Sequence, residues 1–120
     1  MIALTGSTGF VGSHILLELL KRNKNVLALK RPDSDVSYTQ KVFEIHNSSH
    51  LFNKIQWVDC HLSKYSEVVE VFNDVDFVIH AAAQVNLNKT GSKGMIEKNI
   101  KITDNVVNAS ILQHVKRFCY

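Results

Sequence analysis

The sequence has no long apolar run and no concentration of charge of one sign. None of its 120 residues belong to an apolar segment near the roughly 20 residues that a membrane-spanning helix needs. A strand pattern begins at Met1, where a secretory leader would lie, so we expect a cytoplasmic protein with no membrane partner. The net charge of +3 is small and its lysines and arginines are scattered. Nucleic-acid binding would need a basic face, so we expect no nucleic-acid partner.

Cysteine is also scarce. The chain has only Cys60 and Cys119, and we expect both to be free, buried thiols, as is usual in the cytosol. The fold predicted below puts them on strands at opposite edges of one sheet, about 19 Å apart at the usual strand spacing. A disulfide tolerates at most about 7 Å between α-carbons, so we predict no bridge.

Metal ligands are not grouped. His46 and His50 have the spacing of a metal-binding pair on a helix, but no Glu and no third ligand accompany them. The residues between them, Asn47-Ser48-Ser49, favour a loop. We therefore expect no metal site.

What the chain does have is an alternation of two patterns. Continuous apolar runs predict buried strands at residues 2–4, 26–29, 55–58, 77–79 and 115–120. Apolar residues at helical spacing predict helices at residues 10–22, about 40–46, about 65–72 and about 95–114. Ser63 is the expected N-cap of the third helix, and Trp57 is expected in the core.

Three of the predicted helices carry their apolar residues on one side. In the first helix these are Val11, Ile15, Leu16, Leu19 and Leu20. In the third, the expected buried stripe is Tyr65, Val68, Val69 and Phe72. In the last, one side carries Ile96, Ile100, Val107 and Ile111.

Strands that alternate with helices and are apolar throughout are typical of a parallel sheet covered on both faces. Right-handed crossovers then predict a doubly wound parallel sheet of the Rossmann type, with about five strands in the order 3-2-1-4-5. We see no linker and no repeat, and therefore expect one domain over residues 1–120.

A glycine-rich loop follows the first strand and opens the first helix. It reads Gly6-Ser7-Thr8-Gly9-Phe10-Val11-Gly12. Gly6 permits the tight turn out of the strand, Gly9 lets the backbone approach a phosphate, and Gly12 lets the helix pack closely. Amides of the first helical turn then meet the phosphates, which predicts the diphosphate site of NAD(P).

Two other phosphate sites compete with this interpretation. A P-loop is excluded, because no Gly-Lys-Ser/Thr follows at the required offset. A flavodoxin-like FMN site is a stronger rival, since Thr5, Ser7 and Thr8 are suited to wrap a single phosphate. That alternative gives no reason for Gly12.

The end of the second strand bears on the choice of cofactor. An acidic residue there would favour NAD, but the sequence reads Leu29-Lys30-Arg31-Pro32. Arg31 offers a planar fork of donors to a 2′-phosphate, and Lys30 adds charge. We predict NADP, while Asp33 keeps NAD possible and Arg31 is also compatible with a plain surface position.

With these motifs the chain resembles the extended short-chain dehydrogenase/reductases, which include sugar-nucleotide epimerases and dihydroflavonol-type reductases. The family's Thr-Gly-x-x-Gly-x-x-Gly loop matches from Thr5 to Gly12. Its Asp-x-Val-x-His-x-Ala-Ala pattern matches from Asp76 to Ala83, which implies that Ala81, Ala82 and Ala83 line the nicotinamide-ribose side of the cleft. The resemblance also matches Asn99, whose counterpart supports the active site, and Asn105-Val106.

The chain departs from the family in two places. The Gly-Asp-Leu that binds adenine becomes Cys60-His61-Leu62, so that His61 and Leu62 are the implied adenine contacts without a carboxylate. No Tyr-x-x-x-Lys occurs: Tyr38 and Tyr65 are each followed four residues later by valine, and Tyr120 is last. In the family that motif follows the fifth strand, so we expect a truncated, N-terminal part without the substrate domain and without catalytic residues.

Two functions remain open. The resemblance implies a parent enzyme that transfers hydride between NADP(H) and a carbonyl or alcohol carbon of a sugar nucleotide or a small ketone or aldehyde. The alternative is a non-catalytic module that senses NADP or acts as a scaffold. A sheet whose edge is bare also predicts poor stability or self-association of the chain by itself.

Overall fold

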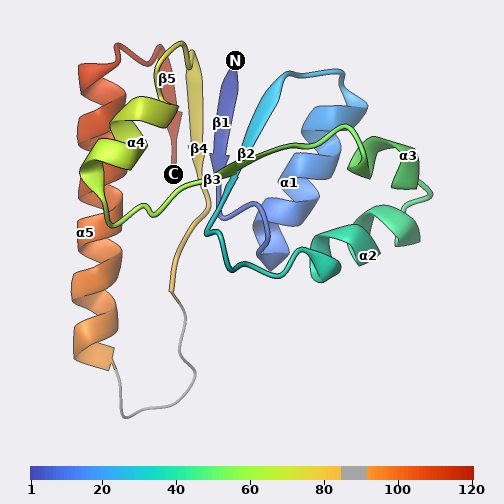
Figure 1. Cartoon of the computed structure of the whole chain (residues 1–120), viewed down its shortest axis with the longest axis horizontal. Helices are drawn as coiled ribbons and strands as arrows, with labels where there is room; N and C mark the ends of the chain where they lie inside the picture. Colours follow the sequence, from blue (N-terminus) through green and yellow to red (C-terminus); the bar gives the residue numbers. More distant parts are fainter. Residues whose placement is uncertain (85–91) are drawn as a thin grey trace.

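The computed structural model describes residues 1–84 and 92–120 as alternating strands and helices (Figure 1). The elements are, in chain order, β1 (Ile2–Thr5), α1 (Phe10–Lys21), β2 (Val26–Lys30), α2 (Ser37–Ile45), α3 (Ser49–Phe52), β3 (Gln56–Asp59), α4 (Tyr65–Val71), β4 (Phe77–His80), α5 (Ser92–Leu112) and β5 (Arg117–Cys119).

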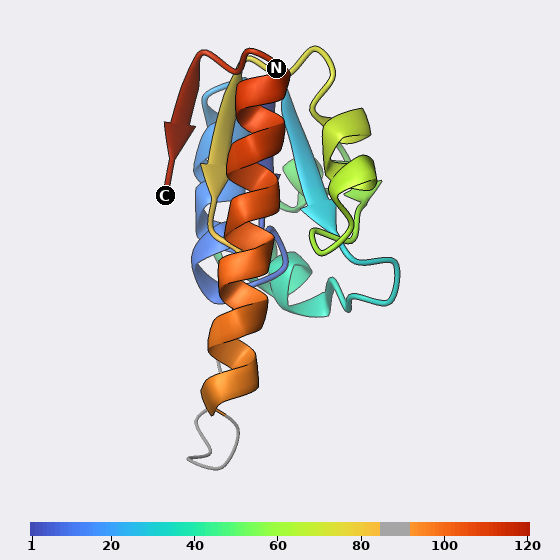
Figure 2. The same cartoon turned by 90° about the vertical axis from the view of Figure 1, so that its left-hand side faces the viewer.

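The five strands form one parallel sheet in the order β3-β2-β1-β4-β5, which confirms the predicted topology. β1 lies at the centre, where Ala3 pairs with Leu27 on one side and Val78 on the other. Helices α1, α2 and α3 cover one face of the sheet, and α4 and α5 cover the other (Figures 1 and 2). The layered arrangement is that of a Rossmann fold.

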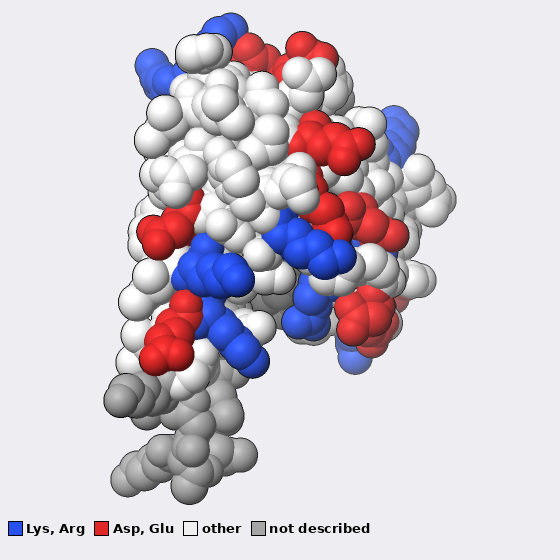
Figure 3. Space-filling model, turned by 60° about the vertical axis from the view of Figure 1, so that its left-hand side comes forward, with Lys and Arg blue, Asp and Glu red and all other residues white. Residues whose placement is uncertain are grey.

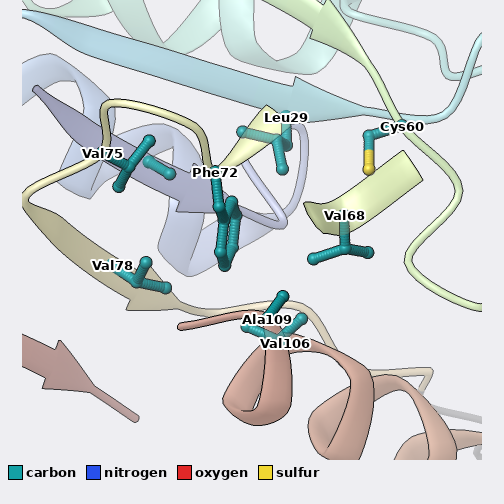
Figure 4. Packing of buried hydrophobic residues seen from close by; sticks show 9 residues of the cluster. Leu29, Cys60, Val68, Phe72, Val75, Val78, Val106 and Ala109 are labelled. Carbon is teal, nitrogen blue, oxygen red and sulfur yellow. The ribbon is translucent and has the colours of Figure 1, made fainter. Parts of the chain in front are cut away.

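Alternate strand residues supply two separate cores, because successive side chains of a strand point to opposite faces. Ala3 belongs to the core under α4 and α5, and its neighbour Leu4 to the core under α1, α2 and α3. In the first core the buried Phe72 ring extends toward Val106 and Ala109 of α5 (Figure 4). Full burial of a phenylalanine stabilises the fold by about 1.5–3 kcal/mol.

Two helical stripes differ in detail from the prediction. In α1 the buried apolar residues are Leu16 and Leu17, whereas Val11 is 58% exposed, because it lies in the first turn beside the glycine loop. In α4 Val68 is buried as predicted, but Tyr65 is 41% exposed. The predicted N-cap is also wrong: Lys64 takes that position with extended dihedral angles and no side-chain cap.

The remaining corrections concern the periphery of the sheet. The segment predicted to hold one helix contains α2 and α3. Cys60 is buried as predicted and both cysteines are free, but Cys119 is exposed, because β5 forms one edge of the sheet. In α5, Ile96, Ile100 and Ile111 are more than half exposed. No helix in residues 1–84 and 92–120 is both long and apolar enough to cross a membrane.

Candidate functional site

A cleft of about 390 Å³ lies where β1, β2, β3 and β4 reach their carboxyl ends. Residues that follow each of these strands line it, and α5 closes the side opposite β2 with Lys98, Lys101 and Ile102. Figure 3 shows Lys and Arg side chains gathered around a hollow between α5 and the strand ends. This edge of an open parallel sheet is where ligands of such folds bind.

The glycine loop is shaped by two close approaches. Gly6 has a φ of +70°, and a β-carbon on it would lie 2.7 Å from backbone atoms of Ala81 and Ala82. A β-carbon on Gly12 would overlap the Gly6 carbonyl oxygen. The tight turn predicted for Gly6 and the close helix packing predicted for Gly12 are both confirmed.

The loop presents backbone amides at the start of α1. The Gly9 amide donates to the Gly6 carbonyl at 2.9 Å, and the first helical bond runs from the Ser13 amide to the Gly9 carbonyl at 2.9 Å. Within the described residues, nothing accepts a hydrogen bond from the intervening amides of Phe10, Val11 and Gly12, and no side chain caps the helix. Such amides, reinforced by the helix dipole, form an anion site.

The other loop residues divide between cleft, core and surface. Thr8 lines the cleft together with Gly6 and Gly9. Ser7 is fully buried, and its Oγ donates toward the Leu29 carbonyl at 2.8 Å, which joins the ends of β1 and β2. The side chains of Phe10 and Val11 are exposed and are not among the cleft-lining residues, so these two can serve the cleft only through their amides.

The two cations at the end of β2 have different surroundings. Lys30 is only 16% exposed, and its Nζ lies 2.5 Å from Asp59 Oδ1. Arg31 is 62% exposed and has only a loose contact of 3.8 Å, from its Nε to Asp33 Oδ1. The charge of Lys30 is therefore already paired, and Arg31 is the more accessible cation at this point of the cleft.

The segment after β3 is held by a carboxylate that the sequence analysis missed. Glu67 Oε2 accepts the His61 amide at 2.7 Å and lies 3.1 Å from His61 Nδ1, while Lys64 Nζ donates to Oε1 at 2.8 Å. The Lys64 hydrogen bond and then that of the His61 amide lower the pKa of Glu67 to about 2. No spacing in the sequence indicated this contact, because a capping-box glutamate bonds the amide of the N-cap residue, whereas Glu67 accepts from His61, three residues before the N-cap Lys64.

A second unpredicted contact comes from α5. Asn105 Nδ2 donates to the Leu62 carbonyl at 2.8 Å, so the helix anchors the segment that carries His61. The sequence indicates Asn105 only as part of a family pattern and does not predict this bond, because 43 residues separate Asn105 from its partner. His61 and Leu62 both line the cleft, as the resemblance implies.

The segment after β4 is tied to β1 and α5 through histidine and asparagine. The buried His80 lies 2.6 Å from Thr5 Oγ1 through Nδ1 and 3.3 Å from Thr103 Oγ1 through Nε2, and its pKa is lowered by burial. Ala81, Ala82 and Ala83 line the cleft. Asn99 lies outside the lining and clamps the Gln84 backbone with bonds of 2.8 and 3.0 Å.

The described residues of the cleft offer neither an ionised thiol nor a group of metal ligands. Cys60 lines the cleft, but burial, followed by the charge of Glu67, raises the pKa of its thiol to about 11, so it stays protonated. In the part of the chain that the structure describes, no three His, Cys, Asp or Glu side chains are grouped to hold a metal ion. The cleft is equipped to bind an anion and to orient it.

Comparison with known proteins identifies the family to which the chain is similar over nearly its whole length. The model of the NAD dependent epimerase/dehydratase family matches residues 2–120. A sterol-4-alpha-carboxylate 3-dehydrogenase (decarboxylating) of Dictyostelium discoideum is 27% identical over 99% of this chain and 34% of its own length. A putative UDP-glucose 4-epimerase of Methanocaldococcus jannaschii is 25% identical over 98% of this chain and 34% of its own length.

A solved structure shares the fold. The UDP-glucose 4-epimerase of Bifidobacterium longum, in complex with NAD+ and UDP, matches 98% of this chain and 35% of its own with a TM-score of 0.76 and 21% identity. The chain thus spans about a third of the length of these relatives.

Proposed function

The chain belongs to the NAD dependent epimerase/dehydratase family, and from that premise we propose that its cleft binds a nicotinamide dinucleotide through the diphosphate. The observation that carries the proposal is the set of amides at Phe10, Val11 and Gly12, which have no acceptor in the described residues. These amides follow directly along the chain from the loop residues Gly6, Thr8 and Gly9, which line the cleft. A diphosphate supplies the acceptors and the charge that these amides favour.

The rest of the cleft fits the remaining parts of a dinucleotide. His61, Leu62, Ala81, Ala82 and Ala83 all line the cleft. This supports the proposal that the first two contact the adenine and that the three alanines form a small-residue wall for the nicotinamide ribose. Asn99 supports that wall through the Gln84 backbone rather than touching the cofactor. When bound, the cofactor supplies a hydride acceptor or donor, and the chain supplies its position.

NADP is the cofactor that the charges favour. Arg31 lines the cleft at the end of β2 with a largely exposed guanidinium, which is suited to hold a 2′-phosphate by two parallel hydrogen bonds. Lys30, paired with Asp59, contributes less than its charge suggests. Solved relatives described with NAD keep that cofactor as the alternative, with Asp33 as the ribose acceptor.

The activity we propose for the parent enzyme is hydride transfer on a carbonyl or alcohol carbon of a sugar nucleotide or a small ketone or aldehyde. The 120 residues contain no Tyr followed four positions later by Lys, the pair that donates the proton in this family. The chain by itself should therefore bind cofactor without turnover. Oxidation of NADPH by the isolated chain, followed by absorbance, would contradict this.

Calorimetric titration with NADP, NAD and FMN tests the proposal. We expect NADP to bind most tightly and Arg31→Ala to weaken it at least about tenfold, the loss expected for a charge-assisted bond. Arg22→Ala is the matched control, because that arginine, 73% exposed, lies at the far end of α1 and should leave the NADP affinity unchanged. Equal affinity for NAD would refute the cofactor preference, and binding of FMN alone would refute the dinucleotide.

A further inference from the structure

His61 has one ring nitrogen engaged and one unengaged. Its Nδ1 lies 3.1 Å from Glu67 Oε2, and its backbone amide donates to the same oxygen at 2.7 Å. No hydrogen bond to Nε2 is found within residues 1–84 and 92–120. The imidazole is 40% exposed and lines the cleft, so the unengaged nitrogen is accessible to a ligand there.

Glu67 decides which nitrogen carries the proton. Its pKa of about 2 makes it an ionised carboxylate at neutral pH, and a carboxylate only accepts hydrogen bonds. The nitrogen facing it must therefore be Nδ1–H. In the neutral imidazole the other nitrogen, Nε2, is then an acceptor.

The next backbone group is a donor. The Leu62 amide has no acceptor within the described residues, and the Leu62 carbonyl is held by Asn105 at 2.8 Å. The end of β3 thus offers an acceptor on His61 and a donor on Leu62, each anchored from a different helix. An adenine base carries the complementary pair on one edge, because its amino group donates and its N1 accepts.

We propose that Glu67 is a positioning residue that holds His61 in the Nδ1–H tautomer, so that His61 Nε2 accepts a hydrogen bond from the amino group of the cofactor's adenine. This inference rests on the proposed function, since it concerns the base of the same dinucleotide. The Glu67–His61 pair thereby replaces a direct carboxylate contact to the base. It makes His61 a residue that discriminates between purines.

Hypoxanthine is the informative competitor. It has a carbonyl oxygen in place of the amino group and an N1–H in place of the bare N1, so both partners at this edge are reversed. If His61 Nε2 accepts from the adenine amino group, it faces the carbonyl oxygen when hypoxanthine binds instead. Two acceptors then face each other and no hydrogen bond forms. Mismatches of this kind are disfavoured far more than a lost apolar contact.

Calorimetric titration of the 120-residue chain with NADP and with nicotinamide hypoxanthine dinucleotide phosphate measures that discrimination. We expect the wild type to prefer the adenine form by about tenfold or more. Glu67→Gln should narrow the preference several-fold, because its amide can donate to Nδ1 and so favour the opposite tautomer. His61→Ala should reduce the preference for the adenine form to the part that the Leu62 amide contributes.

Two further variants separate this role from a structural one. Glu70→Gln makes the same change on an exposed position of α4 and should keep the wild-type preference. The double variant His61→Asp with Glu67→Gln puts a carboxylate directly at the base and should restore the preference lost in Glu67→Gln. Circular dichroism checks that each variant folds.

The possible failures are distinguishable. If the wild type binds neither dinucleotide, the proposed function fails and this inference fails with it. If NADP binds but the hypoxanthine form binds equally well, or if Glu67→Gln and His61→Ala keep the wild-type preference, only the inference is overturned.

Discussion

The two ends of the cleft are built by different means. At the phosphate end, the loop from Gly6 to Gly12 is shaped by the absence of side chains: Gly6 passes 2.7 Å from the Ala81 and Ala82 backbone, and Gly12 has no room for a β-carbon. At the adenine end, His61 and Leu62 are held by side chains that reach in from elsewhere, Glu67 from α4 and Asn105 from α5.

This difference sets what each end tolerates. Backbone packing leaves no flexible group to move aside, so a change at the phosphate end should disturb the fold itself. A side-chain hydrogen bond of the kind found at the adenine end is worth only about 0.5–1.5 kcal/mol to stability. A change there should therefore alter ligand binding more than folding.

The largest effect should come from Gly12→Ala. The added β-carbon would overlap the Gly6 carbonyl, so we expect a loss of about 3 kcal/mol or more in the free energy of unfolding, measured by urea denaturation. Gly94→Ala is the matched control, because nothing lies within 4 Å of its would-be β-carbon and it is in a helix. That variant should be stabilised by up to about 1 kcal/mol. If Gly12→Ala and Gly94→Ala destabilised the chain by similar amounts, the close backbone packing at Gly12 would not be what makes the phosphate end sensitive to change.

Asn105→Ala should affect NADP binding more than stability. Loss of the bond to the Leu62 carbonyl releases the adenine segment, and we expect NADP affinity to fall about three- to tenfold with a stability loss of about 1 kcal/mol. Asn108→Ala, an exposed position three residues further along α5, should change neither quantity. Calorimetry and urea denaturation on the same samples measure both effects. A large stability loss with unchanged affinity would contradict the comparison.

The smallest expected effect is on the stability of the fold at acidic pH. The pKa of Glu67 is depressed in the folded state from an ordinary value near 4.5 to about 2, so its contribution is present above pH 4.5 and is lost as the pH falls toward 2. Glu67→Gln should therefore flatten part of the decline in stability over that range, whereas Glu70→Gln should not. Asp76, whose pKa is lowered to about 2 by Lys116 and the N-terminal amine, accounts for further acid sensitivity in all variants. Identical acid profiles of wild type and Glu67→Gln would argue against the contact.

The difference between the phosphate end and the adenine end also explains which parts of the structure could be predicted from the sequence. The glycine loop was predictable from spacing, because a strand, three glycines and a helix follow one another within residues 2–21. The sheet order was predictable from the alternation of apolar strands and helices, because right-handed crossovers leave few ways to arrange parallel strands. The adenine end was only partly predictable. The resemblance indicated His61 and Leu62, but neither Glu67 nor Asn105 as their supports, since the second partner is 43 residues away in sequence.

Errors in burial have a common physical cause. Periodicity shows which residues share a helix side but not whether another element covers that side. Val11 and Tyr65 lie in the first turns of their helices and remain exposed. Cys119 lies on an edge strand, where β4 covers only one side of the backbone.

The central claim is that the amides at the start of α1 hold the cofactor's diphosphate. Titration of the ¹⁵N-labelled chain with NADP, followed by the amide resonances, tests it most directly. We predict the largest shifts at Gly9, Phe10, Val11 and Gly12, smaller shifts at His61 and Leu62, and none in α3, with inorganic pyrophosphate reproducing the first set alone. Unmoved glycine-loop amides at saturating NADP would contradict the account.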